Sequence, residues 1–302
     1  MKTTSAVRRA LGVVGAVLGT AILLTPSVGE AAAPAHQHQR AQHRADNWAP
    51  AAKATITPGV MMYTKGAQCT ANFIYNDGAG NVYVGYAAHC AGKGAATDTD
   101  GCSTTSLPLG TAVSFVEGGS VASGGTKVGS GTLAYSSWLT EADLGTSDAA
   151  TCAYNDLALV KVAAADTKKV NPSVPFWGGP TGLDTNGTAA GDKVYSYGNS
   201  SLRAGLTALS PKEGLALGDA AADKGWNHPL YTVTPGIPGD SGSGFMTEGG
   251  KAIGTLSTVV IAPAPLSNQI GDLAKELAFA RAHSGIDALQ LVKGTEAFSA
   301  VL

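Results

Sequence analysis

Short runs of β-branched and aromatic residues, separated by glycine-rich turns, recur along most of this 302-residue chain. Runs of this kind predict β-strands. The segment from Asp77 to Gly80 lies between two of them and is typical of a hairpin turn. The 40 glycines suit many tight turns better than long helices. The expected strands are 60–64, 70–75, 82–87, 112–117, 127–135, 156–162, 193–197, 205–210, 230–234, 244–247 and 252–258. Their number and spacing favour β-barrels or a sandwich.

One segment near the end has a helical pattern instead. Apolar residues recur there at the i, i+3, i+4, i+7 spacing of an amphipathic helix. The positions in this pattern are Ile270, Leu273, Ala274, Leu277, Ala278 and Arg281. Asn268 is the expected cap at the start, and Gly285 is the expected end. Residues 171–180 contain three prolines and two glycines, which indicates a connector between two halves.

The N-terminus has the pattern of a secretory signal peptide. Lys2, Arg8 and Arg9 precede an apolar run of about 15 residues, which is short for a membrane anchor. We therefore expect a signal peptide over residues 1–33, cleaved somewhere in 31–35. Residues 36–54, rich in His, Gln, Arg and Ala, are expected to be a flexible pro-segment or linker. The sequence thus predicts a secreted protein that is free of the membrane after cleavage.

The overall charge argues against nucleic-acid binding. The net charge is −2, and it becomes more negative once the basic leader is removed. Nothing in the sequence forms the basic stripe that a phosphate backbone would require.

The chain has four cysteines, Cys69, Cys90, Cys102 and Cys152. In an oxidising compartment two disulfides are expected, whereas CxxC and paired-histidine spacings of zinc sites are absent from the sequence. Four cysteines allow three pairings. A Cys69–Cys90 bond would tie the adjacent histidine to a strand. Cys102–Cys152 would then close a loop of about 50 residues, and a disulfide that closes a loop of this size stabilises the folded protein by roughly 3–4.5 kcal/mol.

Three distant segments supply the residues of a nucleophilic triad. They are Ala87-Ala88-His89-Cys90, the run that begins Asn155-Asp156-Leu157, and Gly239-Asp240-Ser241-Gly242. A serine hydroxyl needs a base to take its proton and an anion to orient that base. Asp143 and Asp148 are rivals of Asp156. However, Asp156 opens an apolar strand, where a carboxylate without a partner would be costly to bury.

With these motifs, residues 60–283 resemble the chymotrypsin/trypsin-like serine peptidases, in particular the secreted bacterial branch. Further matching segments are Val194-Tyr195-Ser196-Tyr197-Gly198 and Gly254-Thr255-Leu256-Ser257. The resemblance implies an all-β fold of two six-stranded antiparallel β-barrels with a C-terminal helix. It places the first barrel in residues 55–165 and the second, with helix and tail, in 176–302. His89 and Asp156 would come from the first barrel and Ser241 from the second.

The resemblance also implies a role for each residue. Ser241 would attack the peptide carbonyl and form an acyl-enzyme, His89 would transfer the proton, and Asp156 would orient His89. The backbone N–H groups of Gly239 and Ser241 would bind the oxyanion. No cofactor and no metal are expected. Polypeptides are the expected substrates, a proteinaceous inhibitor is a further possible partner, and a monomer is expected.

Two features depart from the usual family pattern. The family's aspartate before the serine often pairs with an N-terminus freed by cleavage, but the customary Ile-Val-Gly-Gly start is missing here. The partner of Asp240 is therefore either a terminus near Lys53 to Ile56 or an internal arginine such as Arg203. Residues 286–302 extend beyond the usual family end and suggest no function.

The predicted substrate pocket carries no acidic residue at its base, which falls at Pro235, six residues before Ser241. This argues against a preference for Lys or Arg. The expected binding residues are Pro235, Ile237, Pro238, Ser257, Thr258 and Val259, and Leu256 adds apolar surface. We expect apolar side chains before the scissile bond, with residues 257–259 pairing with substrate as an extra strand.

Two other functions compete with this interpretation. An α/β-hydrolase esterase orders its triad Ser, Asp, His and needs Gly-x-Ser-x-Gly, whereas Ser243 occupies the final glycine position here. A catalytically silent binding protein on the same fold is the second alternative, since a fold does not guarantee activity. Loss of a triad residue would mark such a protein, and all three residues are present.

Overall fold

Antiparallel strands make up most of the regular structure in a computed structural model, which describes residues 47–94, 98–260 and 266–300. The predicted signal peptide and most of the predicted pro-segment lie outside the described residues. Within the described part, no helix combines the length and apolar character needed to cross a membrane.

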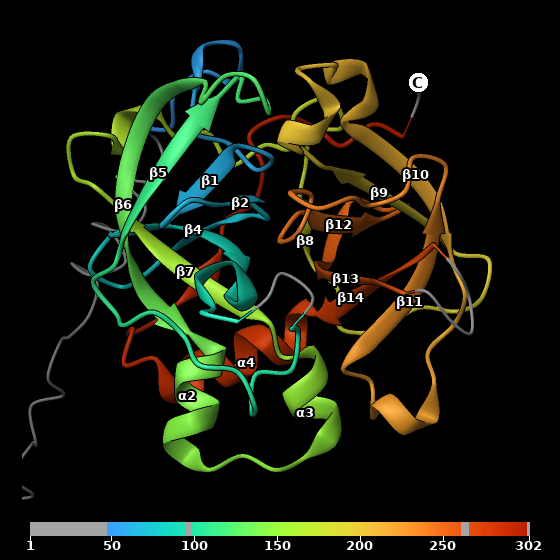
Figure 1. The fold of residues 1–302 in the computed structure, drawn as a ribbon. Helices are drawn as coiled ribbons and strands as arrows, with labels where there is room; N and C mark the ends of the chain where they lie inside the picture. Colours follow the sequence, from blue (N-terminus) through green and yellow to red (C-terminus); the bar gives the residue numbers. More distant parts are fainter. Residues whose placement is uncertain (1–46, 95–97, 261–265, 301–302) are drawn as a thin grey trace, which may run out of the picture. The chain divides into compact units, whose positions relative to one another are not determined.

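The first sheet has eight strands in the order β15-β3-β4-β7-β6-β5-β1-β2 (Figure 1). Its strands are β1 (Met61–Thr64), β2 (Ala67–Thr70), β3 (Ile74–Asn76), β4 (Val82–Ala87), β5 (Ala112–Glu117), β6 (Thr126–Ser136), β7 (Leu157–Val162) and β15 (Gln290–Leu291). The predicted hairpin joins β3 to β4, with Gly80 donating its N–H to the Asp77 carbonyl at 3.0 Å. All pairings within this sheet are antiparallel.

The second sheet closes into a six-stranded barrel. Its order is β12-β9-β10-β11-β14-β13, and β12 also pairs with β13. The strands are β9 (Lys193–Tyr197), β10 (Pro211–Ala216), β11 (Asn227–Thr232), β12 (Gly244–Thr247), β13 (Lys251–Val260) and β14 (Ser267–Asp272). The short β8 (Gly182–Leu183) adds to β13 in parallel. The predicted all-β fold of two antiparallel β units with a C-terminal helix is confirmed. The second unit is the predicted six-stranded barrel, whereas the first is an eight-stranded half-barrel with β15 and β2 at its two edges.

Three helices lie on the lower side in Figure 1. They are α2 (Ser137–Leu144), α3 (Ala149–Tyr154) and α4 (Leu273–His283). The sequence did not predict α2 and α3. Asp148 caps α3 by accepting the Thr151 N–H, and Gly145 ends α2 in the left-handed conformation.

The C-terminal helix begins later than expected. Asn268 and Ile270 belong to β14, which pairs on both sides with β11 and β13. Asp272 is the N-cap of α4, because its side chain accepts the Lys275 N–H at 2.7 Å. Leu273 and Leu277 of the predicted stripe are buried, and Glu276 and Ala280 complete the buried face. Of the other predicted positions on the helix, Ala274 is half-buried, and Ala278 and Arg281 are exposed. The predicted strand 205–210 is likewise wrong, since it contains a 3-10 turn at Thr207–Leu209.

The apolar core continues between the two sheets. One cluster fills the first sheet around Val84, Phe115 and Val160. A second joins side chains of both sheets and of α4, among them Leu159, Met246 and Leu277. Because the two sheets share this second cluster, the loops at their common border are held in fixed positions.

Residues 286–300 leave α4 and return to the first sheet. Leu289 is buried, and β15 pairs with β3. Farther along, Ser299 donates its N–H to the Trp177 carbonyl of the predicted connector at 2.8 Å. This tail thus binds the first sheet and the connector.

Candidate active site

His89 and Asp156 meet because β4 and β7 are antiparallel neighbours, with Ala87 opposite Leu157. His89 follows the end of β4 on a 3-10 turn (Ala88–Ala91), and Asp156 directly precedes β7. Nδ1 of His89 lies 2.7 Å from Oδ2 of Asp156. The backbone N–H of His89 donates to Oδ1 of the same carboxylate at 2.8 Å. Two adjacent strand ends therefore fix the imidazole and the carboxylate against each other.

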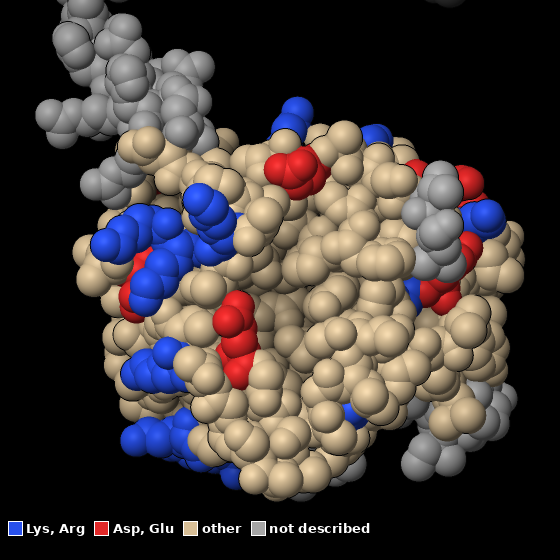
Figure 2. Space-filling model, turned by 90° about the horizontal axis from the view of Figure 1, so that it is seen from above, with Lys and Arg blue, Asp and Glu red and all other residues tan. Residues whose placement is uncertain are grey.

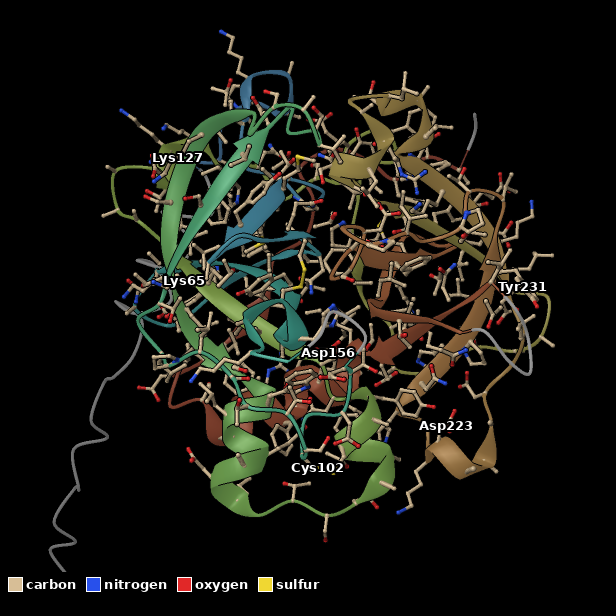
Figure 3. The ribbon with its side chains drawn as sticks, in the orientation of Figure 1. Lys65, Cys102, Lys127, Asp156, Asp223 and Tyr231 are labelled. Carbon is tan, nitrogen blue, oxygen red and sulfur yellow. A yellow bond between two sulfur atoms is a disulfide. The ribbon has the colours of Figure 1, made fainter. Side chains whose placement is uncertain are left out.

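The Asp156 carboxylate is fully buried and has a third donor. Ser257, on β13 of the second barrel, donates its hydroxyl to Oδ2 at 2.7 Å. Figure 3 shows Asp156 at the border of the two β units, near α4. Three donors satisfy a charge that would be costly to bury alone. They favour the tautomer in which Nδ1 of His89 carries the proton, leaving Nε2 as an acceptor.

Ser241 lies in a loop that the second barrel presents to the end of β4. Its carbonyl accepts the Thr70 N–H at 2.8 Å. Gly242 has φ +87°, and a side chain there would meet the Ala87 backbone nitrogen at 2.7 Å. Glycine is therefore required for this loop to approach β4. In the part of the chain that the structure describes, the Ser241 hydroxyl and the His89 ring are not hydrogen-bonded.

The backbone beside Ser241 is arranged to offer two donors. Gly239 has φ +96°, a conformation that favours glycine. Its carbonyl is held by Thr70 Oγ1 at 2.7 Å and by Gln68 Nε2 at 3.1 Å. Among the described residues, the N–H groups of Gly239 and Ser241 donate to no protein acceptor. Such free, oriented N–H groups are the kind that stabilise a developing oxyanion.

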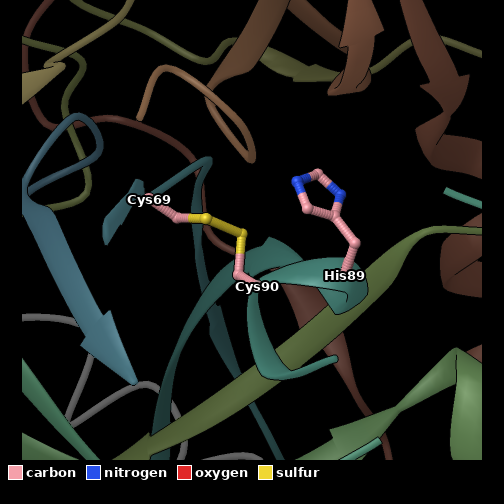
Figure 4. A group of neighbouring side chains, drawn as sticks. All are labelled: Cys69, His89 and Cys90. Atoms are coloured by element: carbon pink, nitrogen blue, oxygen red, sulfur yellow. A yellow bond between two sulfur atoms is a disulfide. The ribbon is translucent and has the colours of Figure 1, made fainter. Parts of the chain in front are cut away.

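Disulfides brace the loops around His89. The bonds are Cys69–Cys90 and Cys102–Cys152, as the preferred sequence pairing predicted. Figure 4 shows His89 next to the first bond. A ring nitrogen of His89 and the two sulfur atoms lie within 4.8 Å of one another. Because both sulfurs are bonded in a disulfide, they offer no thiolates to a metal.

Asp240, which precedes Ser241, pairs with internal cations. Its carboxylate is fully buried, and Oδ2 lies 2.6 Å from Arg203 Nη2 and 3.0 Å from Lys212 Nζ. Of the two expected partners, Arg203 is therefore the one found, and Lys212 was not anticipated. Ile56, in the other candidate segment, is buried and forms an isolated β-bridge with Val170.

The chain is similar to several solved structures of bacterial proteases. Protease A of Thermobifida fusca is 18% identical, with 79% of this chain and 99% of that chain covered and a TM-score of 0.48. The Nocardiopsis protease is 17% identical, over 78% and 98%, with a TM-score of 0.45. The Cellulomonas bogoriensis chymotrypsin is 15% identical, over 78% and 98%, with a TM-score of 0.43. No family model and no curated protein sequence matches the chain.

The residues predicted for the substrate pocket occupy varied positions. Ser257 is buried against Asp156, Pro238 is exposed, and Pro235, Ile237 and Thr258 are half-buried. Val259 belongs to β13, and its side chain lies outside the described part. The Pro235 carbonyl accepts hydrogen bonds from Arg203 Nη2 at 3.0 Å and Lys212 Nζ at 3.4 Å. The predicted base of the pocket therefore adjoins two cations.

The rival acidic residues have other roles. Asp143 is exposed, and Asp148 caps α3 and pairs with Lys224. His228 is buried between two carboxylates, those of Asp219 at 2.7 Å and Asp272 at 2.8 Å. It belongs to β11 of the second barrel, and both of its ring nitrogens are bound to carboxylates other than that of Asp156.

Sequence reasoning missed two buried charged residues near the site, Lys212 and Glu276. Lysine in a strand is ordinarily exposed, so nothing in the sequence marks Lys212. A signal for Glu276 does exist, because it occupies the i+3 position of the apolar stripe that Leu273 begins. A glutamate on the apolar face of a helix requires a buried partner.

Two cavities of about 650 and 690 Å³ share the side chains of Phe176 and Tyr197. Their linings include none of His89, Asp156 and Ser241. The two cavities are therefore separate from the candidate site. Seen from above, the molecule is hollowed near the middle, with a few acidic groups beside the hollow and basic groups gathered at one side (Figure 2).

Proposed function

We propose that this protein is a secreted serine endopeptidase that acts through His89, Asp156 and Ser241. The observation that carries the proposal is the pairing of His89 Nδ1 with the buried Asp156 carboxylate at 2.7 Å. This pairing gives a base whose other nitrogen is available to the nucleophile. The Thr70–Ser241 hydrogen bond supports the assignment, because it ties the serine loop to β2, the strand that carries Cys69 of the Cys69–Cys90 disulfide.

The reaction follows from these groups. His89 Nε2 takes the Ser241 proton as the serine oxygen adds to the peptide carbonyl, and the N–H groups of Gly239 and Ser241 bind the resulting oxyanion. His89 then returns the proton to the leaving amine, which leaves an acyl-enzyme. Water, activated by the same imidazole, releases the acid. The hydrogen bond between serine and histidine is often long in unliganded enzymes and tightens with substrate.

We further propose that cleavage follows apolar side chains. A Lys or Arg side chain at the base near Pro235 would meet Arg203 and Lys212. The nearby Asp240 carboxylate is buried and already paired with both of them. Ile237 and Pro238 supply apolar surface next to this base. A panel of peptides that differ only at the residue before the scissile bond tests the preference. Strict cleavage after Arg or Glu would reject it.

The decisive experiment uses a phosphonylating probe that reacts with activated serines. Wild-type protein should become labelled, whereas Ser241→Ala should not. Ser243→Ala is the matched control, since Ser243 is fully buried two residues away and labelling should persist. If wild-type protein purified without residues 1–46 stays unlabelled, the protein is a binding protein on this fold rather than an enzyme. Mass spectrometry of the secreted protein reports whether the leader is removed.

A further inference from the structure

Glu276 is a fully buried carboxyl on the first turn of α4, directly behind the candidate site. Its neighbours on the same helix face are Leu273, Leu277 and Ala280, which pack into the apolar core shared by the two sheets. A carboxyl in such surroundings persists only when both of its oxygens are bonded.

Both oxygens of Glu276 have partners. Oε1 accepts the backbone N–H of Asp156 at 3.1 Å. Oε2 lies 2.8 Å from the hydroxyl of Thr255 on β13. Ser257, two residues farther along β13, donates to the carboxylate of Asp156 at 2.7 Å. One strand therefore holds both Glu276 and Asp156.

The connection extends across both β units. Asn72, between β2 and β3, donates from Nδ2 to Thr255 Oγ1 at 3.2 Å. The Asp156 carbonyl accepts the Ala88 N–H at 2.9 Å. Asp156 is thus bound through its carboxylate, its carbonyl and its N–H, and Glu276 is the acceptor for the last of these. Without that acceptor, the buried N–H of Asp156 would lack a partner.

Burial, together with the nearby charges of Asp156 and Asp272, raises the pKa of Glu276 well above its ordinary value, although the bonds from Thr255 and the Asp156 N–H oppose the rise. A neutral Glu276 can still accept the Asp156 N–H. It also leaves the Asp156 carboxylate as the only negative charge that faces His89 from this pair of residues.

We propose that Glu276 is a positioning residue, which holds the backbone of Asp156 so that its carboxylate stays aligned with His89 Nδ1. This role rests on the proposed peptidase function. The geometry that carries it is the pair of hydrogen bonds from Asp156 and Thr255 to one fully buried carboxyl.

Two substitutions of Glu276 distinguish the effect of losing the acceptor oxygen from the effect of changing the volume of the side chain. Glu276→Gln keeps an oxygen for the Asp156 N–H, whereas Glu276→Met has similar length and no comparable acceptor. We expect kcat of the Gln variant to stay within about threefold of wild type. The Met variant should lose about tenfold or more in kcat with little change in KM. The buried N–H of Asp156 would then lack an acceptor, and the carboxylate of Asp156 would no longer be aligned with His89 in the transition state.

Two further readouts exclude a merely structural effect. The midpoint of the acidic limb of the kcat/KM profile should be the same for wild type and the Gln variant, since both side chains are neutral. The NMR resonance of the His89 Nδ1 proton should move in the Met variant and stay in place in the Gln variant. Asp77→Leu is the matched control, since Asp77 is a buried carboxyl that also accepts a backbone N–H, that of Asn81 at 2.8 Å, but belongs to the β3–β4 hairpin, and it should leave kcat unchanged.

The outcomes are distinct. Wild-type kcat in the Met variant, equal losses in both Glu276 variants, or an equal loss in Asp77→Leu would overturn the positioning role. If the Met variant does not fold, Thr255→Val tests the same role, and its expected result is a smaller loss of kcat in the same direction. Failure of wild-type protein to react with the phosphonylating probe rejects the peptidase function instead. The NMR comparison still tests the positioning of His89 in that case.

Discussion

Asp240 has two cationic partners on one carboxylate oxygen. Arg203 lies closer, at 2.6 Å, and also binds the Pro235 carbonyl. Lys212 lies at 3.0 Å, and burial lowers its pKa despite the attraction of Asp240. A guanidinium keeps its charge when buried more readily than an ammonium. The alignment of the serine loop therefore depends mainly on Arg203.

This difference can be measured. Arg203→Met should destabilise the fold by about 3–5 kcal/mol, as expected when one partner of a buried pair is removed. Lys212→Met should cost less than about 1 kcal/mol, because Arg203 remains paired with Asp240 and the apolar methionine suits the buried position. Urea unfolding gives both values. The reverse order of the two losses would mean that Lys212 is the principal partner.

At this scale, the sequence predicted residues that stand in short, specific motifs. His89, Asp156 and Ser241 each lie in such a motif, and Arg203 was one of two named partners for Asp240. Lys212 and Glu276 could not be found in this way, because their partners lie 28 and 120 residues distant in the chain. Whether a charged side chain is buried depends on the packing of elements that local spacing does not reveal.

At the scale of elements, the start of α4 depends on a buried ion cluster. Asp272 caps the helix and also accepts a hydrogen bond from His228 Nε2 at 2.8 Å. Burial lowers the pKa of His228, but the bonds to Asp272 and Asp219 outweigh this effect and raise it overall. Lys275 lies in the same small cavity and adds a positive charge nearby. The cap is therefore strongest when His228 carries a proton.

A pH series tests this link. Because the pKa of folded His228 is raised, the stability it contributes is fully present below its unfolded pKa of about 6.5. The contribution is lost as the pH rises through the folded pKa. His228→Gln should lower the free energy of unfolding by about 1–3 kcal/mol at pH 5 and by less at pH 9. An equal loss at both pH values would show that packing, rather than charge, anchors α4.

The sequence pattern predicts most strands and the last helix, but it does not predict where some of them begin and end. Ile270 fits both a helical stripe and a strand, and its pairing with Leu256 in the closed barrel decides for the strand. Residues 205–210 look extended in sequence, but β10 begins at Pro211 and pairs with β9 from there. Tertiary pairing outweighed local preference in both places. By contrast, the β3–β4 hairpin was predictable because its turn residues act locally.

At the scale of the whole molecule, buried carboxyls should make stability fall with rising pH. Burial raises the pKa of Glu141 to about 9, and the charges of Asp156 and Asp100 add to the rise. Between the unfolded pKa of about 4.3 and this value, the unfolded chain releases a proton that the folded protein retains. Ionisation in the unfolded chain therefore favours unfolding as the pH increases.

Glu141→Gln removes this titrating carboxyl and should make the free energy of unfolding depend less on pH. We expect wild-type stability to fall between pH 5 and pH 8 by at least about 1.4 kcal/mol more than that of the variant, which corresponds to one pKa unit. Thermal or urea unfolding across this range provides the comparison. Parallel curves would indicate that Glu141 is ionised in the folded protein.

The tail that follows α4 has a consequence for the order in which the fold is completed. Among the described residues, the edge of β3 that faces away from β4 pairs with Gln290 and Leu291, and the connector between the halves accepts a hydrogen bond from Ser299. During synthesis these residues emerge after everything they bind. The edge of β3 therefore stays open until residues 290 and 291 have been synthesised, after all the strands of the second barrel, so the first sheet cannot be completed before the second barrel is made.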